Sequence, residues 1–254
     1  MTSPDRQTKL RMRKRELDPR ELCHDRLGES FHDSLSQYDT QRRVRTLVDE
    51  FLAPRQKHGA RALDVGCGLG FFSQQLKRSG WDVTACDLGT SMLEQTRLRA
   101  DCKCVPADAM HLTDYFSEPF DVVLSSECIE HTPDPMQALG EMAKLVAPGG
   151  YLALSTPNRL WKPVVAVASS LRLRPFDGYE NFSSFRKIRR SLENSGLQIL
   201  EERGLHLFPF QFRMHAISQW CDRNLQLLRW AMINLCVLAQ RPINSSLASD
   251  RVAA

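Results

Sequence analysis

The chain has 254 residues, of which 42% are hydrophobic, and these values favour one globular domain with a substantial core. No apolar run is long enough to span a membrane, and the first residues lack the apolar stretch of a secretory signal. The eight cysteines include no Cys-x-x-Cys pair, which is typical of a reduced protein rather than of a disulfide framework. These features predict a cytoplasmic location.

The net charge of +4 is unevenly distributed. Residues 1–20 contain seven basic and three acidic residues, so they carry the whole net charge. We therefore expect residues 1–37 to form a basic, partly flexible arm. Such an arm can contact nucleic acid or an anionic membrane surface, but the neutral remainder of the chain argues against a nucleic-acid groove.

The predicted elements alternate between helices and strands. Apolar residues of Tyr38–Leu52 recur at helical spacing, and the apolar segment Arg61–Val65 is typical of a strand. The further elements are a helix over about 71–79, strands over 82–86, 103–105 and 121–124, a helix from Asp134 to Val146 that stops at Pro148-Gly149-Gly150, a strand over 151–155, a helix over 183–195, and strands over 197–205 and 233–239. This alternation predicts a parallel sheet with helices on both faces.

A glycine-rich turn follows the first strand. Gly66, Gly68 and Gly70 stand at alternate positions, and glycine allows both a sharp turn and the close approach of a ligand to the backbone. The helix that begins near Phe71 aims its free amide groups at the same place. Because ligands of open α/β sheets bind at the carboxyl ends of strands, this turn predicts a nucleotide-sized site.

Acidic residues stand at or near the ends of the first three strands. Asp87 lies 17 residues after Gly70, where an acid can accept hydrogen bonds from ribose hydroxyls. Asp108 follows the third strand, and Asp64 precedes the first glycine by two residues. Together with the glycines, this pattern resembles motif I and the strand ends of class I S-adenosylmethionine (SAM) methyltransferases.

The resemblance implies a Rossmann-like α/β domain over residues 38–242 that binds SAM. Its seven-stranded sheet is expected to be mostly parallel, with an antiparallel last strand between the fifth and the sixth, and residues 243–254 are expected to be a disordered tail. In the resembled family the helix before the first strand helps to close the SAM pocket. The residues expected to bind SAM are Asp64, Gly66, Cys67, Gly68, Gly70, Asp87, Leu88, Asp108, Ala109, Met110 and Ser125.

The segment after the fourth strand carries the candidates for the chemistry. Glu127, Glu130 and His131 share one face if this loop coils into a helical turn. With Ser155-Thr156-Pro157-Asn158-Arg159, they resemble the O-methyltransferases of ubiquinone biosynthesis, in which the Glu-x-x-Glu-His cluster is associated with a divalent cation. His131 and Glu130 are the predicted catalytic residues.

Two hypotheses for this cluster stay open. In the first, Glu127, Glu130 and His131 hold a divalent cation such as Mg²⁺, for which carboxylates and imidazole are suitable ligands. In the second, Glu130 and His131 only order the loop beneath SAM, and His131 can still act as a general base without a metal. Asp177 stands about where the ubiquinone family has a further histidine, which weakens the case for the metal.

The insert over about residues 158–182 is expected to form a lid over the acceptor site. It is largely apolar, as is the later cluster Phe208-Pro209-Phe210-Gln211-Phe212. Both segments suggest an apolar or aromatic acceptor, and both also fit docking on a membrane surface or ordinary core packing.

These features predict an enzyme that transfers a methyl group from SAM to a small-molecule acceptor, on a hydroxyl oxygen of an apolar or aromatic metabolite. One alternative is a metal-dependent RNA 2′-O-methyltransferase, which the basic arm favours and the absence of a histidine between His131 and His206 opposes. Another is a non-catalytic SAM-binding regulatory protein, against which the complete cofactor motif argues.

Overall fold

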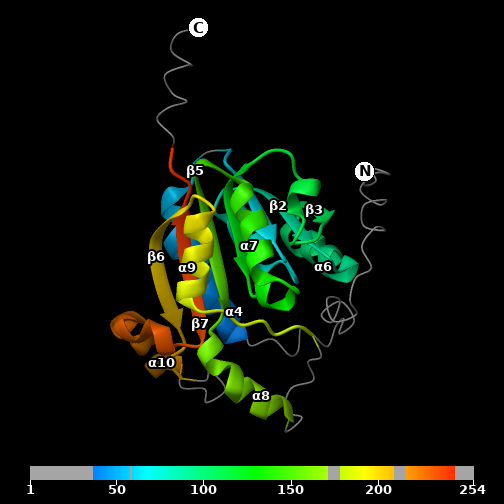
Figure 1. Cartoon of the computed structure of the whole chain (residues 1–254). Coiled ribbons are helices and arrows are strands. Elements are labelled where there is room, and N and C mark those ends of the chain that lie inside the picture. Colours follow the sequence, from blue (N-terminus) through cyan, green and yellow to red (C-terminus); the bar gives the residue numbers. More distant parts are fainter. Residues whose placement is uncertain (1–36, 58, 171–177, 209–214, 244–254) are drawn as a thin grey trace.

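The structure is a computed structural model that describes residues 37–57, 59–170, 178–208 and 215–243 (Figure 1). Residues 1–36 of the predicted arm, the tail over 244–254, Asp177 and residues 209–212 of the aromatic cluster lie outside the described residues. The expectations for these segments therefore stay predictions.

Seven strands form one sheet in the order β3-β2-β1-β4-β5-β7-β6 (Figure 1). They are β1 (Arg61–Val65), β2 (Asp82–Asp87), β3 (Lys103–Pro106), β4 (Phe120–Ser126), β5 (Val146–Pro157), β6 (Gln198–Leu205) and β7 (Asn234–Gln240). Strands β1 to β5 pair in parallel, whereas β7 is antiparallel to both β5 and β6. The predicted Rossmann-like sheet, with its antiparallel last strand between the fifth and the sixth, is confirmed.

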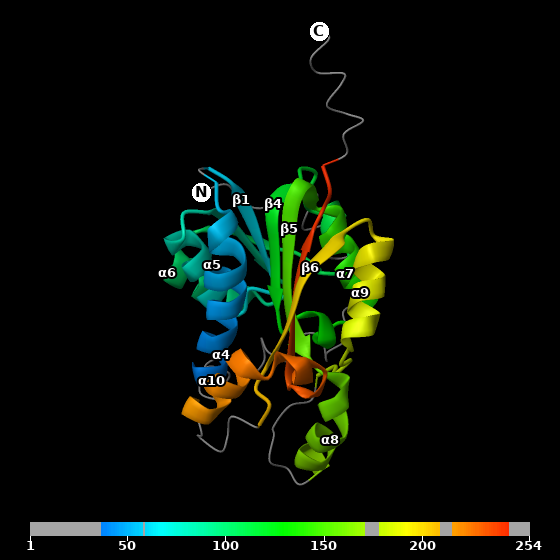
Figure 2. The same ribbon diagram turned by 90° about the vertical axis from the view of Figure 1, so that its left-hand side faces the viewer.

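Helices cover both faces of the sheet, as Figure 2 shows edge-on. One face carries α4 (Gln37–Val44), the π-helix η1 (Arg45–Leu52), the short 3₁₀ segment η2 (Ala53–Arg55), α5 (Phe71–Arg78) and α6 (Thr90–Ala100). The other face carries α7 (Pro135–Lys144) and α9 (Phe185–Asn194), together with the 3₁₀ segments η3 (Leu112–Asp114) and η4 (Ile129–His131).

The side chains of β4 alternate between the two halves of the core. Val122 and Leu124 pack in the apolar cluster that contains residues of η1 and α5, while Val123 packs in the cluster that contains residues of α7 and α9. All three are fully buried. The central strand is thus covered on both faces, which explains its continuous apolar sequence.

The boundary between α7 and β5 differs from the prediction. The helix ends at Lys144 and the strand already begins at Val146, so Pro148-Gly149-Gly150 lies inside the strand and does not end the helix. Gly149 adopts a φ of 79°, and its N–H donates to the carbonyl of Arg241 at 2.8 Å. A glycine in this left-handed conformation lets the chain bend while it stays paired.

The segments after β5 and β6 gather at the carboxyl end of the parallel strands (Figures 1 and 2). They include η5 (Arg159–Trp161), α8 (Lys162–Ser170), α10 (His215–Asn224) and η7 (Gln226–Ala231). Part of the predicted lid over 158–182 is therefore helical. Among the described residues, none of the helices has the length and apolar character needed to cross a bilayer.

Candidate functional site

A pocket opens at the carboxyl ends of β1, β2 and β4, at the edge that the glycine-rich turn predicts. Of the predicted site residues, it brings together Gly66, Cys67, Gly68, Asp87, Leu88, Asp108, Ala109, Glu127 and His131. The other lining residues are Thr40, Arg43, Val65, Leu69, Phe71, Phe72, Gly89, Met92, Ala107, Ser126, Cys128 and Thr132. The pocket wall thus comes from the turn after β1, the ends of β2 and β4, the loop after β3, and the helices α4, α5 and α6.

Backbone hydrogen bonds fix the turn after β1. The N–H groups of Gly66 and Cys67 both donate to the carbonyl of Cys86 in β2, at 2.9 and 3.1 Å. Gly66 has a φ of 70°, and a Cβ atom added there would lie 2.4 Å from the sulfur of Cys128. Only glycine fits between these two walls of the pocket, so Gly66 lets the loop after β4 approach the turn.

Asp87, at the end of β2, and Asp108, after β3, are held in fixed orientations. Asp87 accepts hydrogen bonds from the N–H of Gly68 at 3.0 Å and from the N–H of Gly89 at 2.9 Å. Asp108 accepts one from the N–H of Met110 at 2.9 Å. Because both carboxylates line the pocket, they present preorganised acceptors to a ligand.

Five predicted residues support the pocket from behind and do not line it, namely Asp64, Gly70, Met110, Ser125 and Glu130. Strand β4 runs on to Ser126, so Ser125 lies inside the sheet, where its hydroxyl donates to the carbonyl of Val65 at 3.0 Å. Met110 packs in the apolar core. Gly70 leaves room for Thr96, whose Cα would lie 2.8 Å from an added Cβ. Residues that line the pocket and residues that support it stand in the same turns, so the spacing of the sequence motif does not show which of them face the ligand.

Asp64 is a buried support for the start of α5. Its side chain accepts a hydrogen bond of 2.5 Å from the hydroxyl of Ser73, one turn into that helix. Burial, with a contribution from the nearby charge of Asp87, raises the pKa of Asp64 to about 7. The carboxyl therefore connects the end of β1 to α5 rather than facing the ligand.

Helix α4 supplies two lining residues that the sequence analysis did not identify, Thr40 and Arg43. The apolar periodicity of residues 38–52 identifies apolar core positions alone, and a polar residue that is buried against the pocket gives no such signal. Arg43 is 5% exposed, and its guanidinium donates to the hydroxyl of Ser126 at 2.6 Å. It also pairs with the carboxylate of Asp39 at 2.9 Å.

Hydrogen bonds connect Arg43 to Glu127 through two serines. The hydroxyl oxygens of Ser126 and Ser155 lie 2.8 Å apart, and Ser155 donates to Glu127 at 3.1 Å. Burial opposes the ionisation of Asp39, but Arg43 and His206 outweigh it and hold the pKa of that carboxyl at about 2. Burial likewise disfavours the charged guanidinium, yet Asp39 and Glu127 raise the pKa of Arg43 above its ordinary value.

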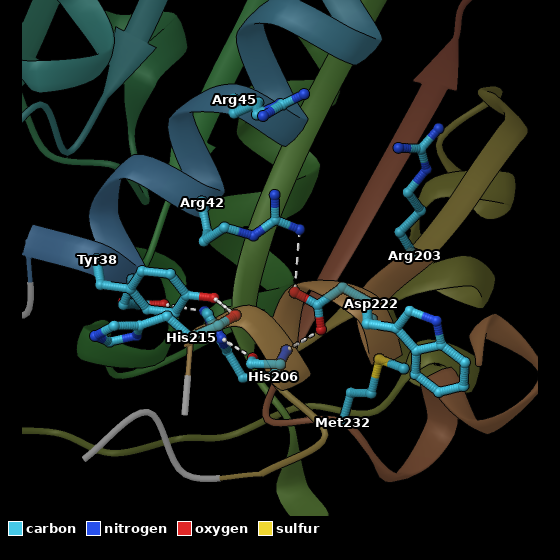
Figure 3. Close-up of polar contacts among 12 residues, drawn as sticks. Tyr38, Arg42, Arg45, Arg203, His206, His215, Asp222 and Met232 are labelled. Atoms are coloured by element: carbon cyan, nitrogen blue, oxygen red, sulfur yellow. Dashed lines mark hydrogen bonds and ion pairs between the residues drawn. The ribbon is translucent and has the colours of Figure 1, made fainter. Parts of the chain in front are cut away.

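Helix α4 is fixed from its other side by the region around α10, as Figure 3 shows. Arg42 forms a buried ion pair of 3.0 Å with Asp222, which also accepts a hydrogen bond of 2.8 Å from the N–H of His206 (Figure 3). The imidazole of His206 contacts the carboxylate of Asp39 at 3.0 Å. Residues about 180 positions apart in the sequence therefore hold the pocket wall in place.

His131 and Glu130 lie in η4, directly after the loop that follows β4. The Nδ1 of His131 donates to the carbonyl of Tyr179 at 2.8 Å, since a carbonyl can only accept. In the neutral imidazole the lone pair then lies on Nε2, on a side chain that lines the pocket. Glu130 is fully buried and accepts a hydrogen bond of 3.0 Å from Thr156, and burial raises the pKa of its carboxyl well above the ordinary value.

Glu127 directly follows β4, and its charge contributes to the raised pKa of the Glu130 carboxyl. Glu127 adopts a φ of 53°, which is unusual for a residue with a side chain, and η4 begins only two residues later. In the residues that the structure describes, no group of three or more His, Cys, Asp or Glu side chains is arranged to hold a metal ion. Ser155 donates to Glu127 and Thr156 to one oxygen of Glu130, while the other oxygen of Glu130 lies 3.9 Å from Nε2 of His131. Glu127, Glu130 and His131 as arranged therefore do not converge on one cation position.

Comparisons with known proteins agree with this geometry. A family model described as a methyltransferase domain matches residues 36–202. The chain therefore belongs to the SAM-dependent methyltransferase family, and SAM is its methyl donor.

Named relatives point to one branch of that family. The chain is 32% identical over 199 residues to a ubiquinone biosynthesis O-methyltransferase of Psychrobacter arcticus, covering 72% of each chain. It is 34% identical over 182 residues to the protein of the same name from Xanthomonas axonopodis pv. citri, covering 67% of this chain and 76% of that one.

A solved structure shares the fold. The SAH-bound magnesium protoporphyrin IX methyltransferase of Synechocystis PCC 6803 is similar with a TM-score of 0.60 at 16% identity, covering 86% of this chain and 97% of that one.

Proposed function

We propose that the protein transfers the methyl group of SAM to a hydroxyl oxygen of a small apolar or aromatic acceptor. The observation that carries this proposal is His131, a pocket-lining side chain whose Nδ1 donates to Tyr179, so that the lone pair of the neutral ring lies on Nε2. The two relatives named ubiquinone biosynthesis O-methyltransferases support oxygen as the methylated atom. The same two relatives favour an acceptor that resembles an intermediate of ubiquinone biosynthesis.

The proposed roles of the pocket residues follow from their chemistry. We assign Asp87 to the ribose hydroxyls and Asp108 to the adenine amine, with Leu88 and Ala109 beside the ring. Arg43 provides a positive group for the carboxylate of the methionine portion. The backbone of Gly68 faces open space, since a Cβ atom added there meets no atom within 4 Å, which leaves room for the cofactor.

The proposed reaction needs one proton acceptor and correct alignment. The acceptor oxygen attacks the methyl carbon in line with the sulfonium, the bond between that carbon and sulfur breaks, and the hydroxyl proton passes to Nε2 of His131. The products are a methyl ether, S-adenosylhomocysteine and a protonated imidazole that returns its proton to solvent. The hydrogen bond to Tyr179 holds the ring in the tautomer that this role requires.

The test of the acceptor class is turnover with SAM labelled in its methyl group. Catechols and phenols with apolar substituents are offered in parallel with amines, thiols and a short RNA. We expect label in an ether product of the hydroxyl compounds alone. Label in RNA, or no label in any acceptor, would contradict the proposal and favour one of the two alternatives given above.

Replacing Asp87 with alanine is expected to weaken the binding of SAM and S-adenosylhomocysteine by about tenfold to a hundredfold. The reason is the loss of a charged hydrogen-bond acceptor, which typically costs about 1.5–3 kcal/mol. Titration calorimetry measures both affinities. Asp82→Ala, at the opposite end of the same strand, is the matched control. Equal affinities of the Asp87 variant and the wild type would remove the ribose assignment.

We also propose that the carboxyl-end surface docks on a membrane, from which an apolar acceptor can enter. Exposed apolar side chains gather there, namely Leu160, Val164 and Val167 on η5 and α8, Ile217 and Trp220 on α10, and Leu227 and Trp230 on η7. Tryptophan is favoured at the boundary between lipid and water. The exposed Arg159 and Arg223 on the same segments complement an anionic surface.

The double substitution Trp220→Ser and Trp230→Ser is expected to weaken sedimentation with anionic phospholipid vesicles by about tenfold or more, because two exposed aromatic side chains no longer enter the lipid. Leu98→Ser is the control, since Leu98 is 77% exposed on α6 and lies away from this surface. Sedimentation of the double variant at the wild-type level would contradict the docking proposal.

A further inference from the structure

A second pocket lies between the start of α9, the start of α7 and η5. Five basic side chains line it, namely Arg159, Lys162, Arg186, Lys187 and Arg190. Asp134 is its one acidic lining residue. The carboxylate of Asp134 accepts from the N–H groups of Met136 and Gln137 as the cap of α7, so it already has partners.

The basic side chains have no acidic partners of their own within the described residues. Arg189, on the same helix, shows the contrast, because it forms an ion pair of 2.5 Å with Glu202 and does not line the pocket. Basic side chains that serve only to keep a protein soluble are commonly interspersed with acidic ones. The concentration of five of them around one hollow instead creates a local positive potential.

The backbone at the pocket is also suited to an anion. Helix α9 begins with Phe185, and its cap Ser184 accepts a hydrogen bond from the N–H of Lys187. The N–H groups of Phe185 and Arg186 have no partner within the helix and can face an anion. Ser183, which precedes this start and lines the pocket, is 1% exposed, and its hydroxyl has no hydrogen-bond partner within the described residues. A buried hydroxyl without a partner costs stability, which a ligand can restore.

The geometry points to a binding site for a phosphate group in this second pocket. A phosphate offers several acceptor oxygens and a charge that several arginine and lysine side chains can share, whereas a lone carboxylate would engage only one or two of them. Two sources of a phosphate group fit this position, the headgroup of an anionic phospholipid and a phosphate on a soluble molecule. The phospholipid fits because α8, with its exposed apolar residues, begins at Lys162.

The pocket is connected to the methyl-transfer site by one short segment. The side chain of Asn181, which lines the second pocket, donates to the carbonyl of Thr132 at 2.8 Å, and its N–H donates to the carbonyl of Glu130 at 2.9 Å. Thr132 lines the first pocket. A phosphate held here is therefore connected to the first pocket through Asn181 and Thr132, although its binding does not depend on methyl transfer.

The experiment compares Arg186→Gln/Arg190→Gln with Arg189→Gln, which removes charge from the same helix outside the pocket. Titration calorimetry at low ionic strength uses inorganic phosphate and pyrophosphate as probes. We expect the wild type and Arg189→Gln to bind pyrophosphate alike, and the double variant to bind it at least about tenfold more weakly. SAM affinity and thermal unfolding of each variant establish that it is folded.

A second arm distinguishes the two sources of phosphate. Sedimentation with phosphatidylcholine vesicles is measured with and without added phosphatidylglycerol. If phosphatidylglycerol increases binding of the wild type but not of the double variant, the site takes a lipid headgroup; if it increases neither, the ligand is a soluble phosphate. The proposal is overturned if the wild type does not bind either probe, if the double variant binds them as tightly, or if Arg189→Gln loses as much affinity.

Discussion

Replacing His131 with alanine is expected to lower kcat about 10²–10⁴-fold on the acceptor identified by the labelled-SAM assay, with little change in SAM affinity. This range is typical of the loss of a general base. The reason lies in the geometry: the hydrogen bond from Nδ1 to the carbonyl of Tyr179 leaves Nε2 to take the proton. Single-turnover kinetics with labelled SAM separate this loss from any effect on product release.

Two controls distinguish catalysis from support of the loop. His111→Ala removes an imidazole from the region before η3, outside the pocket wall, and should leave kcat unchanged. Chelator is a further control, and we expect turnover to persist, because Glu127, Glu130 and His131 are not arranged as ligands of one cation. Full turnover with both Glu127 and His131 replaced by alanine would move the chemistry to another segment, and Tyr179 would be the next residue to test.

Replacing Arg43 with methionine is expected to lower the free energy of unfolding by about 3–5 kcal/mol, since breaking a buried ion pair leaves an uncompensated charge. Asp39 would keep the contact with His206 but lose its partner at 2.9 Å, and Ser126 would lose a donor. Urea denaturation measures this change, and an unchanged slope against denaturant would show that the two-state transition is preserved.

Arg45→Met is the matched control on the adjoining turn (Figure 3). Its side chain is 57% exposed and pairs with Glu50 at 3.3 Å, so its loss should cost less than about 1 kcal/mol. Combining Arg43→Met with Asp39→Leu should recover part of the lost stability, because both charges are then removed. Equal costs for Arg43→Met and Arg45→Met would show that the buried pair does not stabilise the wall of the pocket.

The fold and part of the pocket lining could be predicted from the sequence because both depend on local patterns. Short apolar runs and glycine turns predicted every strand of the sheet, and the turn at Gly66 and the acid at Asp87 placed the pocket at the correct edge. The antiparallel position of β7 came from the family resemblance alone. The alternation of helices and strands along the sequence does not determine which strands the last one pairs with.

What could not be predicted rests on contacts between distant residues. Arg42 and Arg43 look like any other charged helical residues in the sequence, and only their pairing with Asp222 and Asp39 explains why they are buried. The spacing of Glu127, Glu130 and His131 suggested one shared helical face, but Glu127 has a positive φ and lies before η4, so only Glu130 and His131 belong to that helical turn. The five basic residues of the second pocket come from two segments, whose approach the sequence does not show.

The contacts of α4 determine when the nascent enzyme can complete its folding. The match to the methyltransferase family ends at residue 202, before His206, Asp222 and the whole of β7. A nascent chain that stops there has its glycine turn and Asp87, yet Asp39 still lacks its contact with His206 and Arg42 lacks its partner Asp222. Since chains emerge from the ribosome N-terminus first, the cofactor pocket should close only after the last strand is released. A fragment cut at the family boundary should therefore fail to retain SAM.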